Sequence, residues 1–135
     1  MPVKDIMSPA TETIGRNDDL LTVEHIMATK HFRHLPVVED DALVGIVTQR
    51  DLFKAAMPSA MRYGEKAQQD FLHSVRVKEI MVYPVITIAP TAPVSEAIDL
   101  IMQRGIGCLP VVDDGKLVGI VTKTDLLRHL RTISA

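Results

Sequence analysis

The sequence is poor in the residues that several common protein chemistries need. Its single cysteine, Cys108, cannot form an intramolecular disulfide, which fits a reducing compartment. It has no tryptophan and only 4% aromatic residues, so stacking platforms for single-stranded nucleic acids are not expected. Its apolar runs are too short for a transmembrane helix, and its N-terminus does not read as a secretory signal. We therefore expect a cytoplasmic protein with no membrane partner.

The distribution of charges and histidines argues against further classes of function. The formal net charge is −2, without a block of like charge, so a nucleic-acid partner is not expected. The five histidines lack the spacing of metal ligands, so no metal site is predicted. No nucleophile–base pair and no phosphate loop of the GxxxxGK type is present. The sequence therefore does not predict an enzyme.

An internal repeat dominates the sequence. Residues 35–52 read LPVVEDDALVGIVTQRDL, and residues 109–126 read LPVVDDGKLVGIVTKTDL. The same offset of 74 residues places Val3–Met7 on Val77–Met81 without a gap. A unit that occurs twice without insertion or deletion predicts one supersecondary module used twice.

Each repeat predicts the same order of elements. After a short turn comes an extended segment, around Glu12–Ile14 or Val85–Ile88, and then an amphipathic helix. Two β-branched runs on either side of an acidic turn predict a hairpin. A second helix follows at once, with Thr48 or Thr122 as its candidate N-cap and an aspartate three residues later.

The region between the repeats is the least regular. We expect the last helix of the first repeat to end near Ala56, because Met57 and Pro58 follow. Residues 57–76 then form a partly helical linker, with Phe71 and Leu72 anchoring a helix in its second half.

The duplicated pattern of LPVV, an acidic turn and LVGIVTxxDL resembles a CBS domain pair, named after the regulatory region of cystathionine β-synthase. The resemblance covers residues 3–56 as module 1 and residues 77–130 as module 2. It implies an α/β (α+β) fold of tandem modules, each β-α-β-β-α, related by a pseudo-twofold axis. It further implies two clefts that bind adenosine derivatives, as in stand-alone members of the family.

The residues at the strand–helix junctions suit such a ligand. Unpaired N–H groups at a helix N-terminus attract phosphate, and Gly45 and Gly119 are expected to allow close approach to the backbone. The carboxylates of Asp51 and Asp125 can accept two hydrogen bonds from a ribose diol. The same residues can also be read as helix caps without a ligand, and the two roles can coexist.

The resemblance implies composite clefts. The first combines Thr48, Arg50 and Asp51 with a wall of Pro84, Val85, Ile86, Ile106 and Cys108. The second combines Thr122, Lys123, Thr124 and Asp125 with Ala10, Thr11, Glu12, Phe32 and His34. We expect the first to be the tighter site, because an unpaired Glu12 carboxylate in the second would repel phosphate.

Two functions remain open. The first is a regulatory sensor that binds AMP, ADP, ATP or a related compound and acts through a partner protein or a dimer rearrangement. The alternative is a ligand-independent interaction or dimerisation module. In either case the resemblance implies a homodimer, and two small modules have limited core area of their own.

Overall fold

The chain folds into two compact units. The computed structural model describes residues 1–10 and 12–134, without the side chains of residues 59–63. The first unit contains Met1–Thr11, Asp41–Leu43 and Ile86–Ala135. The second unit contains Glu12–Asp40 and Val44–Val85.

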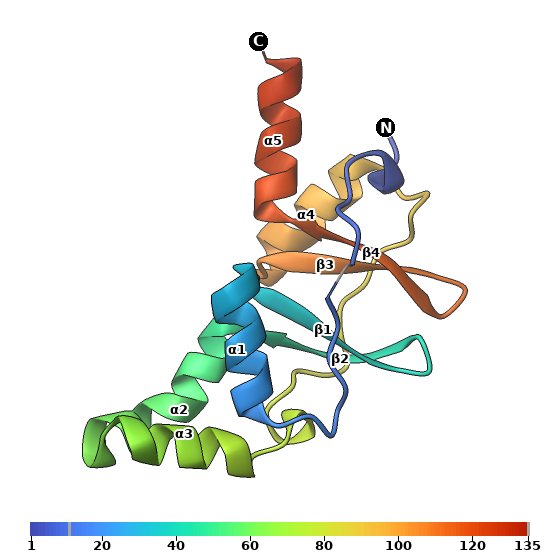
Figure 1. Ribbon diagram of the computed structural model, residues 1–135. Coiled ribbons are helices and arrows are strands. Elements are labelled where there is room, and N and C mark those ends of the chain that lie inside the picture. The colour runs from blue at the N-terminus through green and yellow to red at the C-terminus, as the bar shows by residue number, and fades with distance from the viewer. Residues whose placement is uncertain (11, 135) are drawn as a thin grey trace. The chain divides into compact units, whose positions relative to one another are not determined.

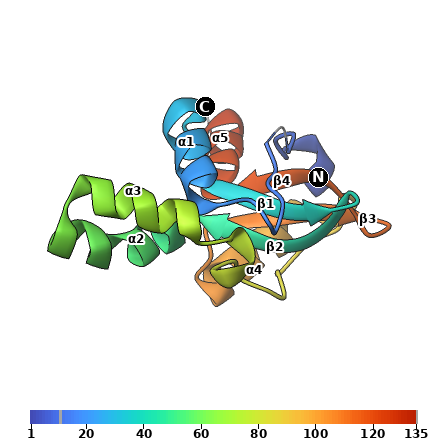
Figure 2. The ribbon, with the colours of Figure 1, turned by 60° about the horizontal axis from the view of Figure 1, so that its bottom comes forward.

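The second unit holds the helix-rich part of the chain (Figure 1). Its elements are α1 (Leu20–Lys30), β1 (His34–Glu39), most of β2 (Ala42–Thr48), α2 (Gln49–Tyr63), α3 (Glu65–Ser74) and a 3-10 turn, Val77–Glu79. Helices α2 and α3 lie side by side, and α3 also contacts α1 (Figure 2). The predicted helix in the second half of the linker is therefore confirmed as α3.

The first unit is built on the second hairpin. Its elements are a 3-10 turn (Val3–Asp5), α4 (Val94–Arg104), β3 (Cys108–Asp113), β4 (Lys116–Thr122) and α5 (Lys123–Ile133). Strands β3 and β4 pair antiparallel, from Cys108 opposite Thr122 onward. The hairpin turn is Asp114–Gly115, and both residues have positive φ, which aspartate and glycine tolerate best. In this unit Ala42 also pairs with Lys116.

The predicted β-α-β-β-α order is confirmed in both halves of the chain. Its first β element is short, because Ile14 and Ile88 each form only one isolated parallel bridge, with Val37 and Val111 respectively. As the sequence predicts, the second strand of each hairpin ends at the junction threonine, Thr48 or Thr122, and the next helix begins at the following residue.

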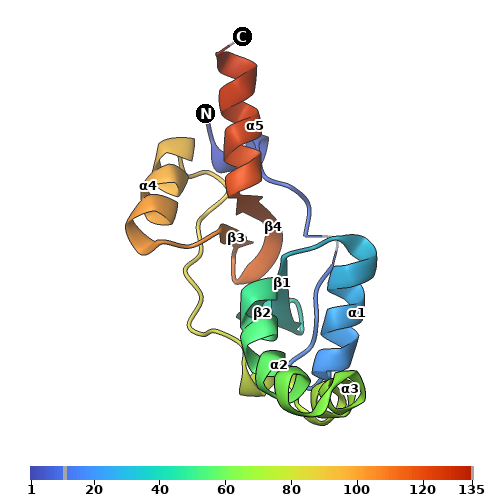
Figure 3. The same ribbon diagram turned by 90° about the vertical axis from the view of Figure 1, so that its left-hand side faces the viewer.

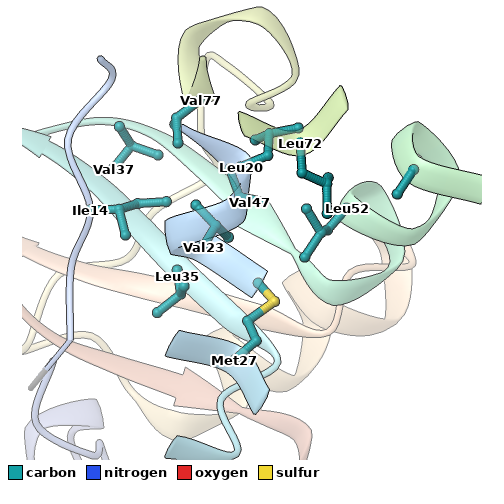
Figure 4. Close-up of a cluster of buried hydrophobic side chains, with 11 residues drawn as sticks. Ile14, Leu20, Val23, Met27, Leu35, Val37, Val47, Leu52, Leu72 and Val77 are labelled. Carbon is teal, nitrogen blue, oxygen red and sulfur yellow. The ribbon is translucent and has the colours of Figure 1, made fainter. Parts of the chain in front are cut away.

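Each unit has its own hydrophobic core. The core of the second unit joins side chains from all of its helices and strands (Figure 4): Ile14, Leu20, Val23, Met27, Leu35, Val37, Val47, Leu52, Ala56, Leu72 and Val77. The core of the first unit consists of Val3, Ile88, Ala97, Ile101, Leu109, Val111 and Val121. Continuous burial along the strands explains why their sequences do not alternate between apolar and polar residues.

The two 3-10 turns are exchanged between the repeats. Val3, from the start of the first repeat, is fully buried among side chains of the second repeat, and its N–H donates to the Ala92 carbonyl at 2.8 Å. Val77, from the start of the second repeat, is fully buried among side chains of the first, and its N–H donates to the Asp18 carbonyl at 2.8 Å. The repeats and the compact units are therefore different divisions of the chain.

Helix α1 begins at an aspartate cap. The Asp19 carboxylate accepts a 2.8 Å hydrogen bond from the Thr22 N–H, which satisfies one of the open donors of the first turn. This bond, more than the nearby His73 and Arg76, holds the pKa of Asp19 below its usual value. Asp19 is therefore the N-cap of α1.

The expected end of α2 near Ala56 is wrong. The helix continues through Pro58 to Tyr63. A proline inside a helix removes one backbone hydrogen bond and crowds the preceding turn, and the remaining turns of a long helix can offset that loss. Contacts with α3 add to the stability of this longer helix.

A glycine–methionine contact holds each 3-10 turn against its strand. A Cβ built on Gly119 would lie 2.5 Å from the Met7 sulfur and 3.1 Å from the Ser8 carbonyl oxygen. A Cβ built on Gly45 would lie 2.6 Å from the Met81 sulfur. Met7 and Met81 therefore pack against the strand glycines, and the space beside these glycines is filled by the chain itself.

We predict that Gly119→Ala lowers the free energy of unfolding by about 1–3 kcal/mol, because the added methyl overlaps Met7 and the Ser8 carbonyl. In the double variant Met7→Ala/Gly119→Ala the two losses should be less than additive. Gly15→Ala is the matched control, since its Cβ would make only an ordinary 3.5 Å contact. Denaturant unfolding measures wild type, Gly119→Ala, Met7→Ala, the double variant and Gly15→Ala, and equal stability of Gly119→Ala and wild type would contradict the contact.

Candidate functional site

The Thr-x-x-Asp segment of the first unit forms a complete capping box at the start of α5. The Thr122 hydroxyl accepts from the Asp125 N–H at 3.2 Å, and Asp125 Oδ2 accepts from the Thr122 N–H at 2.9 Å and from the Thr122 hydroxyl at 3.1 Å. Asp125 Oδ1 accepts from the Ser8 hydroxyl at 2.8 Å and from Arg128 Nη1 at 3.4 Å. The buried carboxylate, with Asp125 only 5% exposed, therefore has four donors of its own chain around it.

In the equivalent Thr-x-x-Asp segment of the second unit, the aspartate carboxylate accepts fewer hydrogen bonds. Asp51 Oδ2 accepts from the Thr48 hydroxyl at 2.8 Å and from the Thr48 N–H at 3.2 Å, and the Asp51 N–H donates to the Thr48 hydroxyl at 3.1 Å. No donor from the described residues reaches Asp51 Oδ1. The predicted cap is thus present in both units, and of the two aspartates only Asp51 keeps a carboxylate oxygen that no donor among the described residues reaches.

Among the described residues, the N-termini of α2 and α5 each offer one free backbone N–H donor. At α2 the Gln49 N–H donates to the Arg33 carbonyl, and the Asp51 N–H is taken by the cap. At α5 the Lys123 N–H donates to the Gly107 carbonyl, and the Asp125 N–H is taken by the cap. Within the described part of the chain, this leaves the backbone N–H of Arg50 and of Thr124 as the first-turn donors available to an anion.

Met7 and Met81 come shortly after the two 3-10 turns. The residue that follows each methionine lies near the motif aspartate and differs in whether it can donate a hydrogen bond to it. Ser8 and Ile120 exchange two backbone hydrogen bonds of 2.9 Å, which places the Ser8 hydroxyl beside Asp125. Val82 and Ile46 exchange the same pair of bonds, at 2.9 and 3.1 Å. Val82 has no hydroxyl and cannot donate to Asp51. Ser8 was not among the predicted site residues. The signal in the sequence is that the repeat offset of 74 pairs Ser8 with Val82, so that only one of the two equivalent positions carries a hydroxyl.

Comparison with known proteins places the chain in a family. The family model described as "CBS domain" matches it twice, over residues 3–58 and 77–132. A CBS domain-containing protein of Dictyostelium discoideum is 35% identical over 127 residues, which cover 93% of this chain and 88% of that protein. The chain is a CBS domain pair.

Two solved structures are informative about ligands. The structure of CBSX2 in complex with AMP has a TM-score of 0.81 and 25% identity, and the match covers 99% of this chain and 98% of the other. The CBS domain pair of protein MJ0100, in complex with 5′-methylthioadenosine and S-adenosyl-L-methionine, has a TM-score of 0.79 and 28% identity, with 99% and 98% covered. Proteins similar to this CBS pair therefore bind adenosine compounds.

Many relatives carry the pair inside a longer chain. In three further curated relatives the CBS pair spans only 21%, 43% and 23% of the whole length. The family therefore identifies the module, while the activities and substrates of those longer proteins belong to them.

The predicted wall residues are divided between the units. Pro84 and Val85 lie with Thr48 and Asp51 in the second unit, whereas Ile86, Ile106 and Cys108 lie in the first. Ala10 lies with Thr122 and Asp125 in the first unit, whereas Glu12, Phe32 and His34 lie in the second. Thr11 lies outside the described residues. Because each composite cleft draws on both units, it remains a prediction.

Glu12 is not the unpaired carboxylate that the ranking of the clefts assumes. Its Oε1 lies 3.1 Å from Nζ of Lys30, the last residue of α1. A cation at this distance offsets much of the repulsion that Glu12 would exert on a phosphate. The difference between the two aspartates is therefore the stronger basis for ranking the sites.

A hollow between α1, α2 and α3 is a poorer candidate for a nucleotide. It has a volume of about 230 Å³ and is lined by Glu24, Met27, Ala28, Gln49, Leu52, Phe53, Ala56, Gln68 and Leu72. This lining supplies no cation for a phosphate, and the volume is below the usual range for small-molecule sites. Among residues 1–10 and 12–134 there is also no cluster of three or more potential metal ligands, and no helix could span a membrane.

Cys108 opens strand β3 and is only 6% exposed, so little of its side chain can face a ligand. Burial raises the pKa of its thiol to about 12. The thiolate is the reactive form of cysteine, so the folded protein should hold Cys108 unreactive.

We predict that a disulfide reagent at mildly alkaline pH labels the native CBS pair far more slowly than the denatured chain. The reason is that burial both shields the Cys108 sulfur and disfavours its thiolate. Absorbance of the released thiol measures the rate in both states. Rapid stoichiometric labelling of the folded protein would show that Cys108 is accessible.

Proposed function

We propose that this CBS pair is a regulatory, non-catalytic sensor of an adenosine derivative such as AMP, ADP or ATP. The observation that carries the proposal is the open Oδ1 of Asp51 beside the N-terminus of α2. A carboxylate accepts hydrogen bonds only, and the vicinal hydroxyls of a ribose donate them. The AMP and S-adenosyl-L-methionine complexes of similar CBS pairs support a ligand of this class.

Other groups around Asp51 suit the rest of a nucleotide. The Arg50 side chain is exposed one position before the aspartate, and its guanidinium can bind a phosphate with two parallel hydrogen bonds. The Arg50 N–H is one of the two free first-turn donors described above. Pro84, Val85, Ile86, Ile106 and Cys108 are the proposed apolar wall for the base.

We call each Thr-x-x-Asp segment, with the first turn of its helix, a half-site. In this proposal the half-site of the first unit, at Asp125, is the weaker one. Lys123 and Thr124 are exposed in the first turn of α5, and the Thr124 N–H has no partner among the described residues. Ala10, Thr11, Glu12, Phe32 and His34 are the proposed wall. Ligand binding would act through a partner protein or a dimer rearrangement; the alternative function is a ligand-independent interaction module.

We predict that AMP or ATP binds the folded protein and that Asp51→Ala weakens the tighter phase about ten- to a hundredfold. The variant removes the acceptor for the ribose hydroxyls. Asp125→Ala should act mainly on a weaker phase. Calorimetry measures both phases, and Asp70→Ala, at an exposed position of α3, is the control with unchanged binding.

A panel of AMP, ATP, NAD and S-adenosyl-L-methionine in a thermal-shift assay identifies the preferred compound, since a ligand that binds only the folded state raises Tm. Absence of any shift and any heat with all four compounds would favour the interaction-module alternative. Loss of the tight phase in Asp125→Ala alone would reverse the proposed order of the sites.

We further propose that the protein forms a homodimer through the helices of the first unit. Helix α5 extends away from the other elements of that unit (Figures 1 and 3). Apolar side chains are exposed on α4 and α5: Ile98, Met102, Leu127, Leu130 and Ile133, at 39%, 76%, 65%, 54% and 66%. In the second unit α3 packs against the equivalent helices, and Ala56, which corresponds to Leu130, is buried there.

We predict a dimer at micromolar concentration, and a monomer for Met102→Glu/Leu130→Glu, because a charge on each helix would have to be desolvated in the interface. Light scattering coupled to size exclusion gives the mass. Tyr83→Glu is the control, since Tyr83 is an exposed aromatic residue, 66% accessible, outside these helices. A monomeric wild type, or a double variant that stays dimeric, would contradict this interface.

A further inference from the structure

The two aspartates of the repeated motif differ in what surrounds them. Asp125 Oδ1 lies 2.8 Å from the Ser8 hydroxyl, whereas Asp51 Oδ1 receives no donor from the described residues. An ionised carboxylate has about four acceptor positions, and Asp125 has four donors of its own chain around it. A ribose diol approaching Asp125 therefore has to displace one of these donors.

Ser8 is the donor that such a ligand would have to displace. The two contacts from Thr122 belong to the helix cap, and losing them would expose the start of α5. Arg128 is the longer contact at 3.4 Å, from a side chain that is 69% exposed. The Ser8 hydroxyl makes the shorter bond to Oδ1, the oxygen outside the capping box.

Val82 shows what the same geometry does without a hydroxyl. It makes the same two backbone bonds to Ile46 that Ser8 makes to Ile120, two residues before the junction threonine in each case. Lys54, the counterpart of Arg128, makes no ion pair with Asp51 within the described residues. The half-sites therefore differ in two donors to Oδ1, Ser8 and Arg128, and Ser8, which follows Met7 where Val82 follows Met81, makes the shorter bond.

We propose that Ser8 is an internal competitor for the ribose position of Asp125 and that Val82 keeps the equivalent position of Asp51 open. These two residues would then set the order in which the half-sites fill. The inference rests on the proposed function, since it concerns the same two aspartates. It adds a determinant that lies outside the Thr-x-x-Asp motif.

Each half-site can be tested alone by removing the other aspartate. In an Asp51→Ala background, Ser8→Ala should tighten AMP binding at the remaining site about tenfold, because ribose no longer competes with the Ser8 hydroxyl. Ser8→Thr is the matched control, since it keeps a hydroxyl and should bind AMP as the parent does. Calorimetry with AMP measures each variant.

The reciprocal exchange introduces the competitor at the other aspartate. In an Asp125→Ala background, Val82→Ser should weaken AMP binding about tenfold, because a hydroxyl can then donate to Asp51 Oδ1. Val82→Ala is the control for the lost methyl groups and should leave the affinity nearly unchanged. Val82 is 49% exposed, so neither change disturbs the core.

The outcomes separate this inference from the proposed function. If the wild type binds AMP and both aspartates matter, but Ser8→Ala leaves affinity unchanged, the competition is wrong while the function stands. Weaker binding in Ser8→Ala would show that Ser8 contacts the ligand instead of competing with it. If neither aspartate variant affects AMP binding, or AMP does not bind at all, the proposed sites and this inference are both overturned.

Discussion

The alignment of each 3-10 turn with the second strand of a hairpin is the constraint on which the candidate sites depend. Two backbone hydrogen bonds, between Ser8 and Ile120 or between Val82 and Ile46, hold this alignment. The preceding methionine lies over a strand glycine that has no side chain to oppose it. Since the strand continues into the junction threonine two residues later, the same alignment decides which side chain faces the motif aspartate.

The Thr-x-x-Asp segment stabilises the start of its helix even without a bound ligand. In both units the threonine and the aspartate satisfy each other's backbone N–H groups, so the first turn of the helix is stable without a bound molecule. A preorganised acceptor reduces the entropy lost when a ligand binds. Capping and ligand binding are therefore compatible uses of one carboxylate, provided that one of its oxygens remains open.

Much of the fold follows from local sequence. The hairpins are marked by β-branched runs around acidic turns, and the caps at Thr122 and Asp19 by residue type and spacing. The continuation of α2 through Pro58 was not predictable, because contacts with α3 oppose the local preference of proline. The exchange of the turns was also hidden, since Val3 and Val77 lie in equivalent contexts and their partners are distant in the chain.

In the candidate site, too, the local sequence predicts some features and tertiary contacts determine the others. Thr48, Asp51, Thr122 and Asp125 could be named from a repeated motif, but the state of each carboxylate depends on residues outside it. Lys30 reaches Glu12 from the far end of α1, and Ser8 reaches Asp125 from 117 positions away. Such pairs are set by tertiary structure, and no spacing in the sequence announces them.

The exchanged turns also bear on how a protein of this kind could have arisen. A chain with a single repeat would carry a turn that does not pack against its own helix and hairpin. It could complete its core only by exchanging that turn with a second copy, as in a domain-swapped dimer. When two repeats are joined in one chain the exchange is intramolecular, so completion of the cores no longer depends on protein concentration. In one chain the two copies can differ in sequence, and here a serine follows Met7 where a valine follows Met81.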